Sequence, residues 1–74
     1  TYIVLEVNGL GYKIFIPASG LNKLPQLNEI YLVHTSLIIK EMSQALYGFH
    51  EALERDLFEV LLNVNGIGPK TALS

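Results

Sequence analysis

The chain has 74 residues, of which half are hydrophobic and 16% are charged, and its formal net charge is −2. This composition is that of a folded chain rather than a disordered one, and the length allows one small domain, or one domain plus part of another. The absence of cysteine excludes a disulfide framework and a thiolate metal site, and the negative net charge argues against nucleic-acid binding through a broad basic surface.

The first third of the chain predicts a β-hairpin. Residues 2–7 and 12–16 alternate from one residue to the next in the manner of half-buried strands. Between the two runs, Asn8-Gly9 followed by Leu10-Gly11 favours a tight turn, because both glycines accept positive φ. Pro17 lacks a backbone N–H and is expected to end the second strand.

The middle of the chain predicts a loop followed by a second pair of strands. Residues 18–28 are rich in Ser, Gly, Asn and Pro and read as a loop, with room for one helical turn at 21–24. A long β-rich run covers 29–40, residues 41–43 form a turn, and 44–49 return as a strand. Four or five short antiparallel strands are typical of a small barrel or sandwich.

After Gly48 the hydrophobic period changes to that of a helix. Glu51 and Glu54 fall in its first turn, where negative charge suits the helix dipole. Asn63 and Asn65-Gly66 supply the stop, and Pro69 is favoured at the first position of a second helix. The apolar stripe at helical spacing comprises Leu53, Leu57, Val60, Leu61 and Val64, widened by Phe58 and Leu62.

The connection between these two helices carries the strongest functional pattern. Gly66 and Gly68 flank Ile67, which is expected to be buried against both helices, and their missing Cβ atoms allow another backbone to approach closely. The N–H groups at the new helix start form an anion site. The pattern predicts a helix-hairpin-helix motif that grips DNA phosphates, with the DNA-binding residues Asn65, Gly66, Ile67, Gly68, Pro69, Lys70 and Thr71. The alternative is a plain helix connector whose glycines serve packing.

The other candidate features are weaker. Glu41 is expected at a hairpin tip, where a solvated turn acid is the default interpretation. His34 is expected on a strand face with a satisfied ring nitrogen, and His50 at the boundary before the helix. Aromatic residues could stack bases in a groove, although core packing is the commoner role; they are Tyr2, Tyr12, Phe15, Tyr31, Tyr47, Phe49 and Phe58.

No part of the sequence carries a catalytic or membrane-spanning pattern. There is no supported Ser/His/Asp arrangement and no phosphate-binding loop ending in Gly-Lys-Ser/Thr. The apolar runs are too short to cross a bilayer. We therefore predict a cytoplasmic DNA-binding protein that is not an enzyme, uses no cofactor or metal and has no membrane partner.

Three segments in series resemble the bacterial RuvA family: residues 7–12 with Pro17, residues 46–49, and residues 65–70 with 72–73. The resemblance implies an incomplete OB-fold barrel over 1–49, without its first strand, and the start of a helix-hairpin-helix domain over 50–74. It also implies a homotetramer on four-way (Holliday) junction DNA in recombination and repair. A RuvB-type AAA+ ring motor would drive branch migration by hydrolysing ATP, docking through a domain absent here.

The sequence departs from the family pattern at two places. Family members carry two adjacent acids at the hairpin tip, an acidic pin facing the junction centre, whereas Glu41 is followed by Met42. Both ends of the chain also read as cuts, so a longer parent protein is expected. The alternatives are a generic helix-hairpin-helix segment of another repair enzyme, and a protein-interaction domain whose glycines are structural.

Overall fold

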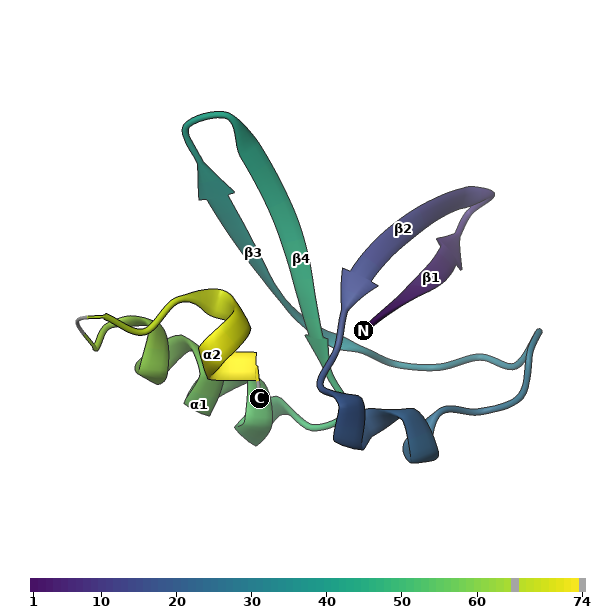
Figure 1. Ribbon diagram of the computed structural model, residues 1–74. Coiled ribbons are helices and arrows are strands. Elements are labelled where there is room, and N and C mark those ends of the chain that lie inside the picture. The colour runs from purple at the N-terminus through teal and green to yellow at the C-terminus, as the bar shows by residue number, and fades with distance from the viewer. Residues whose placement is uncertain (65, 74) are drawn as a thin grey trace.

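A computed structural model describes residues 1–64 and 66–73. A four-stranded sheet in the order β1-β2-β4-β3 is followed by two helices that lie beside its lower end (Figure 1). The two hairpins diverge from a common base, where the chain passes to the helices. The elements are β1 (Tyr2–Val7), β2 (Leu10–Phe15), the 3-10 helix η1 (Ala18–Lys23), β3 (His34–Lys40), β4 (Ser43–Phe49), α1 (Ala52–Leu62) and α2 (Pro69–Leu73).

The first hairpin forms as predicted. β1 and β2 pair antiparallel from Tyr2↔Phe15 to Val7↔Leu10. Asn8 and Gly9 occupy the turn with φ of 54° and 83°, the conformation that matches the twist of a two-residue hairpin. β2 begins at Leu10, two residues earlier than expected, because the two-residue turn allows β1 and β2 to pair directly beside it, at Val7↔Leu10.

The long predicted strand over 29–40 is wrong in its first part. β3 begins only at His34, and residues 29–33 form an irregular segment after a turn at Asn28, whose φ is 70°. Ile30 and Leu32 have the alternation of a strand but are exposed. Alternation predicts a strand only if a partner strand is available, and in the described residues none pairs with this segment.

The sheet is mixed and open, rather than wholly antiparallel as expected. β3 and β4 pair antiparallel from His34↔Phe49 to Lys40↔Ser43. β4 also joins β2 in parallel, through Ile14↔Leu46 and Phe15↔Tyr47. In the part of the chain that the structure describes, β1 and β3 are the sheet edges and no ladder closes a barrel.

Gly48 permits the close approach of the two hairpins at their base. A Cβ atom at this position would lie 2.5 Å from Ile14 Cγ2 and 2.6 Å from Val33 Cγ1. Real Cβ atoms essentially never come that close to other heavy atoms, so the glycine is required by packing. Ile14 and Ile16 are buried on the face of the sheet toward which a Cβ at Gly48 would point.

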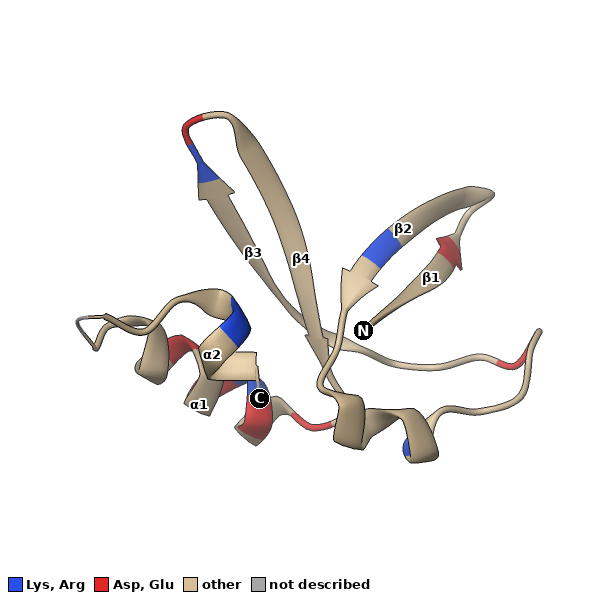
Figure 2. Ribbon diagram, in the orientation of Figure 1, with Lys and Arg blue, Asp and Glu red and all other residues tan. Residues whose placement is uncertain are grey.

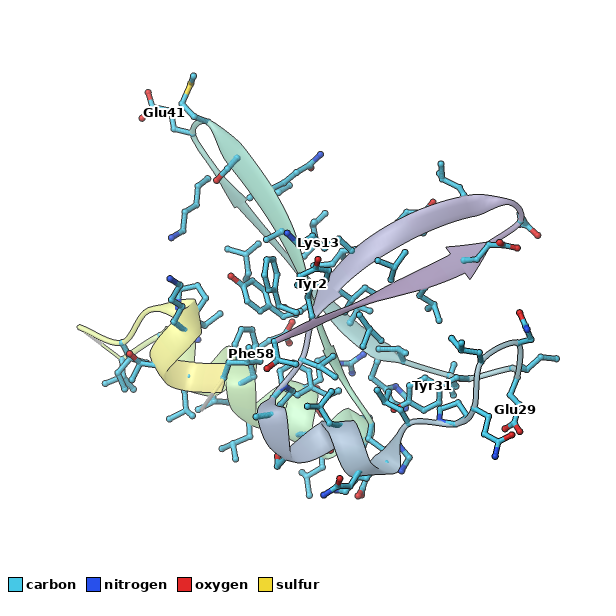
Figure 3. All side chains as sticks on the ribbon, turned by 45° about the vertical axis from the view of Figure 1, so that its right-hand side comes forward. Tyr2, Lys13, Glu29, Tyr31, Glu41 and Phe58 are labelled. Atoms are coloured by element: carbon cyan, nitrogen blue, oxygen red, sulfur yellow. The ribbon has the colours of Figure 1, made fainter. Side chains whose placement is uncertain are left out.

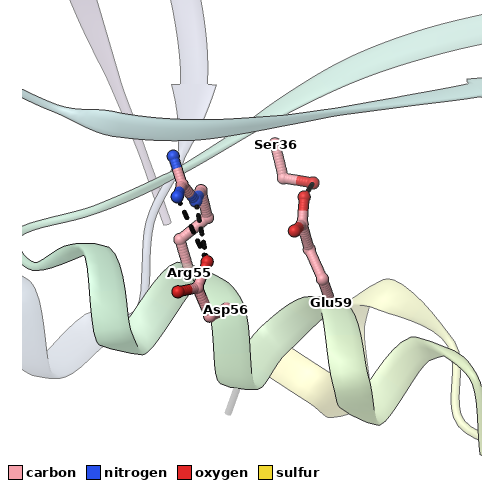
Figure 4. A network of polar contacts seen from close by, with 4 residues as sticks. All are labelled: Ser36, Arg55, Asp56 and Glu59. Carbon is pink, nitrogen blue, oxygen red and sulfur yellow. Dashed lines mark hydrogen bonds and ion pairs between the residues drawn. The ribbon is translucent and has the colours of Figure 1, made fainter.

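Helix α1 packs against the opposite face of the sheet through Phe58. This side chain is 1% exposed and contacts Tyr47 and Phe49, with ring centroids 5.2 Å and 5.0 Å away. The next residue of α1, Glu59, accepts a 2.7 Å hydrogen bond from the hydroxyl of Ser36 on β3 (Figure 4). Ser36 is buried, so this bond satisfies a polar group inside the sheet–helix contact.

Most of the predicted apolar stripe of α1 faces solvent in the described structure. Leu53 is 76% exposed, and Leu57, Val60 and Val64 are also exposed. The spacing correctly predicts the helix, but Phe58 is the one residue of the stripe that is fully buried, because the sheet contacts the side of the helix that carries it.

Candidate nucleic-acid interface

Local contacts hold the helix that leads into the predicted DNA-binding turn. The backbone N–H of Glu51, just before α1, donates to Glu54 Oε1 at 3.2 Å. The bond gives the backbone N–H of Glu51, the residue that precedes the helix, a hydrogen-bond acceptor. At the other end, the N–H groups of Asn63 and Val64 both donate to carbonyls three residues earlier, at 3.1 Å. α1 therefore ends in a tight turn at Asn63, as predicted.

The turn between α1 and α2 depends on Gly66. Its φ is +85°, a conformation that glycine adopts without a steric penalty. The next N–H group, that of Ile67, donates to the carbonyl of Val64 at 3.2 Å and pulls the chain back toward α1. Ile67 is half-buried rather than fully buried as expected. Asn65, the first predicted site residue, lies outside the described residues.

Gly68 has a different role from Gly66. Its φ is not positive, and a Cβ atom there would meet no described atom within 4 Å. Neither backbone conformation nor packing in the described chain requires glycine at this position. Within the described residues, Gly68 is therefore an open stretch of backbone.

The second helix begins at the predicted residue. Pro69 is the first residue of α2, and the N–H of Ala72 donates to the carbonyl of Gly68 at 3.0 Å. Lys70 and Thr71 are exposed residues in the first turn. Six of the predicted site residues, 66–71, thus form one continuous segment from the turn into the first turn of α2.

Glu41 lies at the tip of the second hairpin, at the far end of β3 and β4 from the helices (Figure 3). Lys40 and Ser43 pair across the strands directly below it. Met42, the other residue of the turn, is 94% exposed. The predicted position of Glu41 is confirmed, and the tip presents one acid next to an apolar side chain.

The two histidines lie apart from this segment. His34 begins β3, paired with Phe49, and the described residues provide no hydrogen bond to its ring, contrary to expectation. His50 lies between β4 and α1, as predicted, and its Nδ1 is 3.1 Å from the hydroxyl of Tyr31. The two rings stack with centroids 6.0 Å apart. Within residues 1–64 and 66–73, no three His, Asp or Glu residues gather in a way that could hold a metal ion.

Comparison with known proteins decides the family of this chain. A family model described as the RuvA N terminal domain matches residues 1–48. A Pseudomonas putida protein named Holliday junction branch migration complex subunit RuvA is 45% identical over 73 residues, 99% of this chain. A protein of the same name from Protochlamydia amoebophila is 49% identical over 71 residues, 96% of this chain. The chain belongs to the RuvA family.

This RuvA-family chain corresponds to only part of those relatives. The alignments cover 36% of the Pseudomonas putida protein and 35% of the Protochlamydia amoebophila protein. A further relative from Stutzerimonas stutzeri, also named as the branch migration complex subunit, is 45% identical and covered to the same 36%. The chain therefore spans about a third of the length of the curated relatives that it matches.

Several contacts of the RuvA-family chain were not foreseen from its sequence. They include the bond from Ser36 to Glu59, the stacked pair of Tyr31 and His50, and the position of Lys13 over the ring of Tyr2. Each joins residues that are distant along the chain or on different strands, so no local pattern signals them. The described residues also include no helix with the length and apolarity needed to cross a membrane.

Proposed function

We propose that this chain is part of a non-catalytic DNA-binding subunit that recognises four-way (Holliday) junctions and supports ATP-driven branch migration by a partner motor. The observation that carries the proposal is the 45–49% identity, over almost the whole chain, to proteins named as branch migration complex subunits. The alternative, a generic DNA-gripping segment of a different repair enzyme, receives no support from these relatives.

In this proposal the DNA contact is a helix-hairpin-helix grip on the phosphate backbone, made by residues 65–71. Gly66 supports the turn through its positive φ, and the open backbone at Gly68 allows a close approach. Lys70 and Thr71 are exposed at the start of α2, where a cation and a hydroxyl donor suit phosphate oxygens. Such contacts hold the DNA without reading its sequence.

The proposed division into domains rests on the same family relationship. Residues 1–49 would be the major part of an OB-type barrel, and residues 50–74 the beginning of a helix-hairpin-helix domain. The four-stranded sheet and the matched family model over 1–48 support the first assignment. The helix, turn and second helix over 52–73 support the second.

Glu41 would act as an acidic pin toward the junction centre. Its exposed position at the hairpin tip supports this role, since a carboxylate near phosphates repels them and helps to part strands. The assembly would be a homotetramer around the junction, and a RuvB-type AAA+ ring would supply ATP hydrolysis through a domain outside this chain.

The experiment compares Gly68→Ala with Gly20→Ala in the full-length protein, meaning this segment with the sequence that completes it to the length of its relatives. Neither new Cβ meets a described atom within 4 Å, and neither glycine has positive φ. Both variants should therefore fold. Gly68→Ala should weaken four-way junction binding about tenfold, equivalent to about 1.4 kcal/mol, because its methyl group would stand between backbone and phosphate.

Binding is measured by titrating labelled four-way junction and linear duplex of equal length, at two salt concentrations. Preference for the junction and an affinity that falls with salt are expected. Equal affinity for both DNAs would overturn junction recognition. An unchanged affinity of the Gly68→Ala protein would overturn the proposed grip at this turn.

A further inference from the structure

One face of the sheet carries both α1 and two lysines. Ser36 and Tyr47 are cross-strand partners that contact α1, so their side of the sheet is the α1 side. Phe15 pairs with Tyr47 in the neighbouring strand. Side chains two residues apart along a strand share a face, so Lys13 lies on the α1 side.

The same rule places the second lysine. Lys40 is four residues beyond Ser36 on β3 and therefore also lies on the α1 side, next to the tip that carries Glu41. Figure 2 shows the basic positions of β2 and β3 on separate hairpins above the helices, with that of α2 below them. The α1 side thus displays positive charge on both arms of the sheet, despite the net charge of −2.

Lys13 is held in place by aromatic rings. Its Nζ lies 4.4 Å from the ring centroid of Tyr2 and 5.2 Å from that of Phe15, within the range of a cation–π interaction. The two rings are themselves in edge contact, with centroids 6.2 Å apart. The contact restricts the long side chain before any ligand binds, so less conformational entropy remains to be lost on binding.

Within residues 1–64 and 66–73, no carboxylate forms an ion pair with Lys13. Its partner across the ladder is Val4, an apolar residue. The acid on the same face of the first hairpin, Glu6, pairs with Gly11 further along the strands. Tyr2 is 54% exposed, and Lys13 is also exposed. An exposed ammonium, positioned by rings and lacking a carboxylate partner, suits a phosphate oxygen.

We propose that Lys13 is a second phosphate contact of the bound junction, on the sheet rather than on the helical turn, and that Tyr2 and Phe15 position it. This inference rests on the proposed DNA-binding function. The DNA would then run along the α1 side of the sheet, from the turn at 66–71 toward the β3–β4 tip. A phosphate there would contact the ammonium while the rings continue to support the aliphatic stem.

The test replaces Lys13 by glutamine in the full-length protein, with Lys23→Gln as the matched control. Lys23 is an equally charged, exposed residue in the last turn of η1, outside the four strands. Loss of one phosphate contact should lower the slope of log K against log salt by about 0.9 for each copy of the chain on the junction. The expected fall in affinity is about three- to tenfold at moderate salt, for junctions of any sequence.

A third variant, Tyr2→Leu, separates positioning from charge. It keeps the lysine, so the salt slope should stay at the wild-type value while affinity falls by a smaller factor, about twofold. Lys13→Arg should restore both slope and affinity. Far-UV circular dichroism of each variant shows whether the sheet is intact, which is expected because both side chains are exposed.

The outcomes separate this inference from the proposed function. A wild-type protein that does not bind the junction would refute the function itself. Normal wild-type binding with an unchanged slope and affinity in Lys13→Gln, or an equal loss in Lys23→Gln, would overturn the role of Lys13 alone. If Lys13→Gln impaired branch migration with the partner motor but left junction binding intact, the lysine would contact a protein carboxylate, which also overturns the phosphate contact.

Discussion

Replacing Gly48 by alanine tests the packing that joins the two hairpins at their base. The new methyl group would lie 2.5 Å from Ile14 Cγ2 and 2.6 Å from Val33 Cγ1, against an ordinary contact distance of at least 3.4 Å. The neighbours would have to move by 0.9 Å and 0.8 Å. Both are β-branched and therefore stiff at χ1, and Ile14 is 2% exposed. The strain must then pass to the backbone.

Overpacking of this kind costs about 1–3 kcal/mol, and the upper half of that range is expected because two rigid side chains are displaced. In a domain of this size, each kcal/mol lowers the melting temperature by roughly 4–8 °C. The assay is thermal and urea unfolding followed by far-UV circular dichroism. Gly20→Ala is the control, since its Cβ meets no described atom within 4 Å.

A double variant sharpens the measurement. Val33→Ala removes one of the two methyl groups that the new Cβ would strike, so combined with Gly48→Ala it should cost less than the sum of the two single changes. Strict additivity, or a Gly48→Ala protein as stable as Gly20→Ala, would refute the reasoning that β2, β4 and residue 33 are in tight contact.

The remaining predictions concern the contacts of α1 and of the segment before β3. Ser36→Ala removes the 2.7 Å bond to Glu59 and should cost about 1.5–3 kcal/mol in urea unfolding, because the bond is partly buried and its acceptor is a carboxylate; a loss below 0.5 kcal/mol would contradict this. Burial, and secondarily the charge of Glu54, raise the pKa of Tyr31 above its ordinary value of 10.0. Because the folded state favours the protonated phenol, stability should be intact below about pH 10 and fall as the pH rises through the raised pKa. Tyr31→Phe should lose this alkaline decline, which a series of unfolding midpoints from neutral to alkaline pH would detect.

The candidate site was largely predictable because its signals are local. The positive φ of Gly66 and the start of α2 at Pro69 depend on the conformational limits of single residues. The position of Glu41 at a tip follows from the strand pattern on either side of it. Lys13 was missed, because its significance depends on Tyr2 across the ladder, and a lone lysine in a strand carries no signal of that kind.

The fold was predictable to the extent that it consists of local elements. Alternation and the Asn8-Gly9 turn correctly indicate the first hairpin, and the 3.6-residue period correctly indicates α1. The same alternation over 29–33 misleads, because those residues have the pattern of a strand without a partner to pair with. Pattern shows which conformation a segment can adopt, whereas pairing depends on segments elsewhere in the chain.

By itself, the sequence determines the hairpin turn, the two helices and the glycine-supported connection between them, since each depends on neighbouring residues. Tertiary structure alone decides the parallel pairing of β2 with β4 and the need for Gly48 at their junction. It also decides that Phe58 is the residue of the predicted stripe that joins α1 to the sheet, while Leu53 and Leu57 are exposed, and that Lys13 lies over the ring of Tyr2. The physical reason is the same in each case: these features arise from contacts between different elements of the chain, and their geometry exists only once the sheet has formed.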